Sequence, residues 1–101
     1  MITRIVRLTI QPEKAAAFLE RFNNTYSAIR NFKGCSHLRL FSDAQQPNIF
    51  ITYSHWENEE ALEHYRLSAL FQSTWSEVKP MFAAAPVAFS MNEIVGDSSV
   101  G

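Results

Sequence analysis

Four titratable side chains are placed where they could act on a small molecule. Tyr65 falls on the inward-facing side of an expected helix, while His37, Arg39 and His55 fall on two expected strands. An imidazole can act as a general base at neutral pH, and a phenol can hydrogen-bond or exchange a proton with a bound substrate. We therefore expect Tyr65, His37 and His55 to be the catalytic candidates and Arg39 to contact substrate.

The same residues also fit purely structural roles. Tyr65 suits an amphipathic core tyrosine whose hydroxyl reaches the rim. Strand alternation sets His37 opposite Leu38 and His55 opposite Trp56, so either histidine could lie at a subunit interface and bond a backbone carbonyl. No spacing pairs them with an orienting carboxylate. Both interpretations stay open.

Three further aromatic residues, Trp56, Phe71 and Trp75, could form a wall for a flat ligand. The i, i+4 spacing of Phe71 and Trp75 is also typical of an ordinary helix core. The two interpretations are compatible because small-molecule pockets are mostly apolar. We expect these three residues to bind substrate, and we expect the ligand to be a small apolar or aromatic molecule.

Other kinds of site are not expected. The histidines form no His-x-His pair and have no adjacent aspartate, so no metal site is predicted. The chain has 3 glycines and no glycine-rich phosphate loop. Its single cysteine, Cys35, excludes a disulfide framework. No cofactor is implied by any of these patterns.

Composition limits the class of protein. The 101 residues are enough for one domain, and a content of 47% hydrophobic and 13% aromatic residues excludes intrinsic disorder. A net charge of −1 argues against nucleic acid or an anionic membrane as partner. The sequence has neither an apolar run long enough to span a bilayer nor a signal-peptide pattern, so we expect a cytoplasmic protein.

The hydrophobic periodicity predicts a β-α-β-β-α-β order over residues 1–95, followed by a flexible tail over residues 96–101. Strands are expected over 2–10, 35–42, 49–56 and 87–95. A first helix should run from Pro12 to a stop near Gly34, and a second helix should run from its cap at Asn58 to about Leu67. A short helix should follow, which Pro80 kinks or ends. This order is typical of an α+β, ferredoxin-like fold with a four-stranded antiparallel sheet and its helices on one face.

The first helix should bury one stripe of side chains: Ala15, Phe18, Leu19, Phe22, Tyr26 and Ile29. Its opposite side should carry Lys14, Glu20, Arg21 and Asn24. In the strands, by contrast, both faces carry large apolar groups, such as Ile5 opposite Leu8. A sheet face left uncovered by helices would expose a large apolar patch, so we expect a homodimer through that open face.

Four stretches together resemble the antibiotic biosynthesis monooxygenase family. They are Gly34-Cys35 before a strand, Asp43 to Pro47-Asn48 before the next, Trp56-Glu57-Asn58-Glu59-Glu60-Ala61-Leu62, and Ser68-Ala69-Leu70-Phe71. The likeness covers almost the whole chain, and the Trp-x-x-x-x-Ala-Leu helix entry is its most specific part. It implies a dimeric α+β barrel with a pocket between the sheet and the helices of each subunit. Members oxidise quinols or polyketide-like aromatics without metal or flavin, degrade haem, or have no known activity.

The chain departs from the family pattern at several positions. Ser54 stands where members often have Glu, and Tyr65 and Leu70 stand where they often have His. Haem-degrading members need an Asn and a His where this chain has Val6 and Trp75. Valine cannot hydrogen-bond a haem-bound ligand and an indole N–H cannot ligate iron, so haem degradation is disfavoured.

Two functions follow from this resemblance. The first is a cofactor-independent monooxygenase that acts on a small aromatic, quinol or polyketide-like substrate. The second is a non-catalytic dimeric module that binds a small ligand or acts in a stress response, which the missing Glu and His residues favour. An open pocket beside Tyr65 would support the first, and a pocket filled by Phe71 and Trp75 would weaken it.

Overall fold

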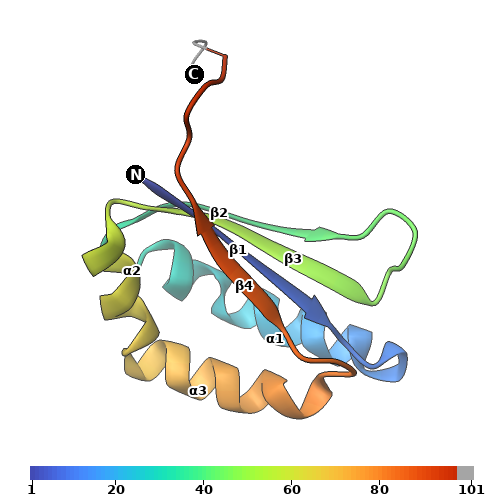
Figure 1. The fold of residues 1–101 in the computed structure, drawn as a ribbon. Helices are drawn as coiled ribbons and strands as arrows, with labels where there is room; N and C mark the ends of the chain where they lie inside the picture. Colours follow the sequence, from blue (N-terminus) through green and yellow to red (C-terminus); the bar gives the residue numbers. More distant parts are fainter. Residues whose placement is uncertain (98–101) are drawn as a thin grey trace.

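The computed structural model describes residues 1–97, and its elements follow the expected order. They are β1 (Ile2–Thr9), a 3₁₀ helix (Pro12–Lys14), α1 (Ala15–Arg30), β2 (Cys35–Ser42), β3 (Ile49–Trp56), α2 (Glu59–Arg66), α3 (Ala69–Val78), a second 3₁₀ helix (Lys79–Met81) and β4 (Val87–Met91). The strands form one antiparallel sheet, and Figure 1 shows the helices gathered on one side of it. The α+β, ferredoxin-like fold is therefore confirmed.

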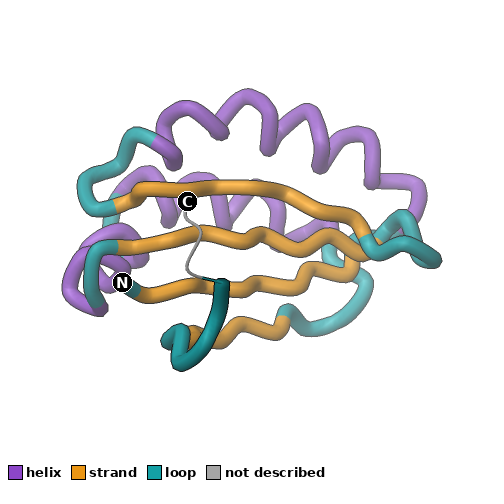
Figure 2. The backbone as a smooth tube through the Cα atoms, turned by 90° about the horizontal axis from the view of Figure 1, so that it is seen from above, coloured by secondary structure: helices purple, strands orange, loops and turns teal. Residues whose placement is uncertain are grey.

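The sheet has the strand order β2-β3-β1-β4. In the register of β1 and β3, Ile2 faces Trp56 and Leu8 faces Phe50. Figure 2 views the sheet from the side opposite the helices, so the helices lie behind the strands. Because successive side chains alternate, the even-numbered residues of β1 and β3 point to the helices and the odd-numbered ones point to this uncovered side, which we call the outer face.

The core between helices and sheet is divided into two clusters. One cluster contains Leu8, Ile10, Phe18, Phe50 and Val78. The other contains Ile2, Trp56 and Leu62, with Tyr65 packed against it. Full burial of each large apolar side chain stabilises the fold by roughly 1.5–3 kcal/mol, so the helices are held on the sheet at two separate places.

Several details differ from the sequence-based expectations. Strand β4 ends at Met91 rather than at residue 95, and the first helix opens with a 3₁₀ turn at Pro12. The two helices expected after Asn58 are confirmed, and Ser68 separates them because its hydroxyl caps α3 by accepting from the N–H of Phe71. Within the expected tail over 96–101, residues 98–101 lie outside the described part of the chain.

The expected set of buried side chains on α1 is partly wrong. Leu19 and Tyr26 are 40% and 37% exposed, whereas Thr25 is buried. Arg21, expected on the outer side of the helix, is half-buried and pairs with Glu77 of α3. The reason is that α1 packs on both β2 and α3, so the side of the helix that faces α3 is also covered.

The corner between α1 and β2 depends on Gly34, whose φ of +91° suits a residue without Cβ. A Cβ built there would lie 2.5 Å from the Cβ of Ala61 in α2. We expect Gly34→Ala to lower the free energy of unfolding by more than about 1 kcal/mol, because the backbone conformation and the contact with α2 both oppose it.

Urea unfolding followed by far-ultraviolet circular dichroism measures this loss. Gly96→Ala is the matched control, because a Cβ there meets only the flexible side chain of Glu93. Equal unfolding midpoints for Gly34→Ala and the unaltered protein would contradict the role given to this corner.

Candidate active site

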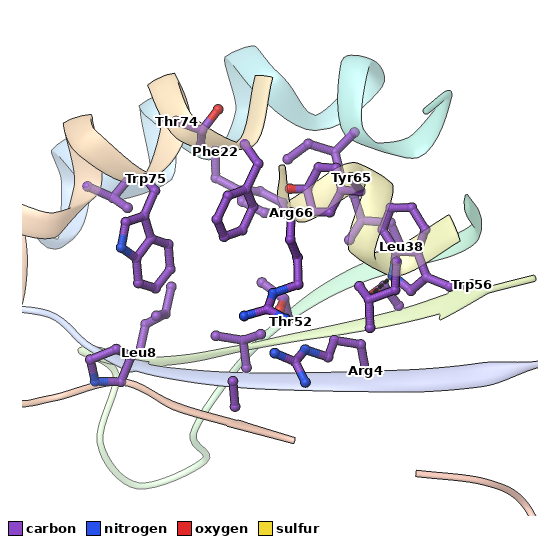
Figure 3. A pocket seen from close by; sticks show the side chains of 18 of the residues that line it. Arg4, Leu8, Phe22, Leu38, Thr52, Trp56, Tyr65, Arg66, Thr74 and Trp75 are labelled. Atoms are coloured by element: carbon purple, nitrogen blue, oxygen red, sulfur yellow. Dashed lines mark hydrogen bonds between the residues drawn. The ribbon is translucent and has the colours of Figure 1, made fainter. Parts of the chain in front are cut away.

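A cavity of about 350 Å³ lies between the sheet and the helices, in the space that separates the two core clusters (Figure 3). Its lining takes residues from β1, α1, β2, β3, α2, α3 and β4 and includes Leu8, Phe18 and Val78 of one cluster and Trp56 and Leu62 of the other. This volume falls within the range of small-molecule sites and matches a flat organic ligand of modest size.

Trp56 closes one end of the cavity. It is the last residue of β3, is only 1% exposed, and its indole N–H donates to the hydroxyl of Ser54 at 2.9 Å. That bond satisfies a buried polar group which would otherwise cost about 1–3 kcal/mol. Ser54 therefore holds the tryptophan in place at this end of the cavity.

Tyr65 stacks on Trp56, with ring centroids 4.8 Å apart and an interplanar angle of 24°. Its position follows from α2, which begins after Asn58, where the side-chain oxygen of Asn58 accepts from the N–H of Ala61 at 2.8 Å. Burial, and secondarily the charge of the Cys35 thiolate, raise the pKa of Tyr65 to about 12. The phenol is therefore protonated at neutral pH and can donate a hydrogen bond, but it cannot act as a base there.

Phe71 and Trp75 form the wall on α3. They are one helical turn apart and their rings stack at 5.6 Å with an interplanar angle of 12°. Phe71 also meets the ring of Tyr65 edge to face at 5.2 Å, and this contact joins α3 to α2. The structure thus brings Trp56, Tyr65, Phe71 and Trp75 to one cavity, and they leave its interior open rather than filling it.

The cavity also contains cations that the sequence interpretation overlooked. Arg4 of β1 and Arg66 of α2 both line it, and their guanidinium groups point into it beside Thr52 (Figure 3). A hydroxyl of Ser90 accepts from Arg4 at 3.1 Å. One signal was available: Arg4 interrupts a strand face that otherwise reads Ile2, Val6, Leu8.

The other three candidates lie elsewhere. His37, His55 and Arg39 are on the outer face, where the two imidazole rings stack at 4.7 Å and the Nε2 of His55 lies 3.2 Å from the hydroxyl of Tyr53. Burial first, and then the charges of His55 and Arg39, lower the pKa of His37. None of these three residues lines the cavity.

Among residues 1–97, no cluster of three or more His, Cys, Asp or Glu side chains is arranged to hold a metal ion. Val6 and Trp75 both line the cavity, and neither side chain can ligate iron. Within the same residues, no helix is both long and apolar enough to cross a bilayer.

Solved structures with this fold are numerous. An antibiotic biosynthesis monooxygenase aligns with a TM-score of 0.88 at 19% identity, covering 94% of this chain and 100% of its own. A conserved protein from Methanosarcina mazei aligns with a TM-score of 0.86 at 16% identity, over 93% and 94% of the two chains. A protein from Pseudomonas aeruginosa gives 0.82 at 18% identity over the same shares. These likenesses establish the fold.

A search of curated protein sequences gives no significant match. The family described as antibiotic biosynthesis monooxygenase matches residues 1–75, which extend from β1 into α3 and include most of the cavity lining. The resemblance inferred from the Trp56 helix entry and the neighbouring stretches is thereby confirmed, and the chain belongs to the antibiotic biosynthesis monooxygenase family.

Proposed function

We propose that the protein is a cofactor-independent monooxygenase that oxidises a small aromatic, quinol or polyketide-like substrate inside the cavity. The observation that carries this proposal is a cavity of about 350 Å³ walled by aromatic rings, into which Tyr65 brings a phenol kept protonated by burial. A space of this kind excludes water from a reactive intermediate while accepting a flat ring.

The reaction balances without metal or flavin. The substrate loses a proton, and its electron-rich anion reacts with O₂. One oxygen atom enters the product, as the new carbonyl of an anthrone or as a ring hydroxyl of a quinol, and the other leaves as water with two hydrogens of the substrate. The substrate supplies all four electrons that reduce O₂. Tyr65 donates a hydrogen bond to the substrate oxygen on which negative charge develops.

Ligand binding without catalysis is the second candidate, and one observation favours it. The lining of the cavity contains no histidine, aspartate or glutamate among the described residues, so no ordinary base is in place to take the substrate's proton. Catalysis would then require a substrate acidic enough to release its proton to water.

Oxygen consumption separates these candidates. With anthrone and a panel of naphthoquinols, we expect uptake above the buffer background, with one O₂ consumed for each anthraquinone or hydroxynaphthoquinone formed. Tyr65→Phe should lower kcat by about 10-fold to 100-fold, because one hydrogen bond to the developing oxyanion is lost. An oxygen electrode measures the rate, and product absorbance gives the stoichiometry.

Tyr26→Phe is the matched control, since Tyr26 lies outside the cavity and bonds the carbonyl oxygen of Leu38. Uptake no faster than background for the whole panel would favour the ligand-binding module. A normal rate in Tyr65→Phe would remove Tyr65 from the mechanism.

Titration of the phenol tests its protonation state directly. Ultraviolet difference titration of the protein against Tyr65→Phe should show a tyrosinate transition near pH 12, well above the ordinary tyrosine value of 10.0. Because the folded-state pKa is raised, the buried phenol stabilises the fold fully below pH 10, and that stabilisation is lost as the pH rises from about 10 to 12. A transition at the ordinary value would show that the phenol is not desolvated.

We also propose that two copies pair through the outer face. Strand β4 is exposed along its whole length, with Phe89 and Met91 at 46% and 40%, and Phe41 is exposed on the same face. An apolar strand surface of this kind on a monomer is typical of an interface. In this arrangement His37, His55 and Arg39 lie between the subunits.

Sedimentation velocity tests this pairing. We expect the protein to sediment as a dimer and Phe89→Glu to sediment as a monomer, because a charge would be buried without a partner. Leu67→Glu is the control, since Leu67 is exposed at the junction of α2 and α3, away from the outer face. A monomeric unaltered protein, or a dimeric Phe89→Glu, would contradict the pairing.

A further inference from the structure

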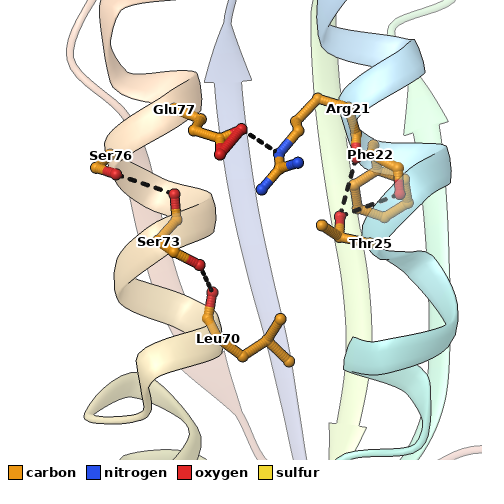
Figure 4. Close-up of polar contacts among 7 residues, drawn as sticks. All are labelled: Arg21, Phe22, Thr25, Leu70, Ser73, Ser76 and Glu77. Carbon is orange, nitrogen blue, oxygen red and sulfur yellow. Dashed lines mark hydrogen bonds and ion pairs between the residues drawn. The ribbon is translucent and has the colours of Figure 1, made fainter.

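Three arginines reach the cavity, and two of them already have a carboxylate partner. The Nε of Arg21 lies 2.7 Å from a carboxylate oxygen of Glu77, which joins α1 to α3 (Figure 4). A terminal nitrogen of Arg66 lies 3.1 Å from a carboxylate oxygen of Glu63. Each of these two guanidinium groups therefore has a carboxylate close to it.

Arg4 differs from both. Among residues 1–97 no carboxylate oxygen lies within 4.0 Å of its guanidinium, whose polar contact is the hydroxyl of Ser90. A guanidinium has five N–H donors, so most of those of Arg4 remain available to a ligand. The cavity therefore carries one positive charge that no described side chain neutralises.

Arg66 brings a second positive charge close to Arg4. Burial first, and then the charge of Arg66, lower the pKa of Arg4, while the weaker influence of the Glu63 carboxylate raises it. Figure 3 shows the two side chains converging from α2 and β1 on the same part of the cavity. Two cations held together beside apolar walls repel each other, and an anion between them would relieve that repulsion.

We propose that the cavity binds a flat aromatic ligand through an anionic oxygen, a carboxylate or a phenolate, which Arg4 and Arg66 hold together while the ring lies against Phe71 and Trp75. This inference rests on the proposed function in taking the cavity as the substrate site. Arg66 is 47% exposed, so the anionic end of the ligand lies toward water and its ring lies inside.

Arg4 and Arg66 also compensate for the absence of a base from the described lining of the cavity. A positive field lowers the pKa of a phenolic substrate and so favours its anion without a base among the side chains. The substrate class is thereby narrowed to aromatics that bear an acidic oxygen near the oxidised ring. Neutral aromatics of the same size should bind less well.

Calorimetric titration of the unaltered protein tests the proposal. The two probes are 3-hydroxy-2-naphthoate and 3-hydroxy-2-naphthamide, which share a shape and differ in charge. We expect the carboxylate to bind at least about tenfold more tightly, the range of a charge-assisted hydrogen bond. A second arm uses 2-naphthol below and above its own pKa. Tighter binding of 2-naphthol above its pKa would show that the site accepts a phenolate. If only the carboxylate probe binds more tightly, the site is assigned to carboxylates. Both results support the inference.

Arg4→Met and Arg66→Gln should each abolish most of the preference for the carboxylate while the amide still binds. Lys14→Met, which removes the same charge from an exposed position outside the cavity, should keep the preference. Arg66→Gln changes a half-exposed side chain and keeps the test decisive if Arg4→Met fails to fold.

Equal affinity for the two probes, binding of neither, or a preference that survives both substitutions would overturn the inference. Because the readout is binding, its outcome is separate from turnover. Charge-selective binding without oxygen uptake would uphold the inference and reject the monooxygenase. Oxygen uptake with no charge preference would do the reverse.

Discussion

The separation between the two hydrophobic clusters is the constraint on which the site depends. Phe18 and Val78 hold α1 and α3 on one end of the sheet, and Leu62 holds α2 at the other end beside Trp56. Protein interiors are close-packed, so a space of about 350 Å³ persists only where packed side chains on both sides keep the helices from collapsing onto the sheet. The break between α2 and α3 lets the helical segment follow both ends of the sheet around this space.

Low polarity within that space governs the chemistry of the few polar groups that reach it. It keeps the Tyr65 phenol protonated far above neutral pH and makes the proximity of Arg4 and Arg66 costly. A donor that cannot ionise and a pair of cations are both suited to negative charge on a ligand. The cavity accordingly combines apolar walls, which select shape, with the Arg4 guanidinium, which has no carboxylate partner among the described residues.

Much of the fold was predictable because its signals are local. Alternating β-branched residues mark β1, helical spacing relates Phe71 to Trp75, and the capping oxygen of Asn58 sets the start of α2. Non-local packing caused the misses. Arg21 and Thr25 are covered because α3 lies beside α1. The sequence of α1 alone does not predict that α3 packs there. Arg4 is a charged residue on an otherwise apolar strand face, which is visible in the sequence. The sequence did not show that Arg66 would lie beside it.

The sequence by itself determined the element order, the family and the chemical nature of the aromatic residues, because periodicity and the Trp56 helix entry are properties of contiguous chain. Only the tertiary structure decided which polar groups meet. Alternation places His37 and His55 opposite Leu38 and Trp56, yet only the docking of the helices makes one face the cavity and the other the open surface. Arg4 and Arg66 are 62 positions apart in the chain, and their meeting depends on the packing of α2 across β1 and β3.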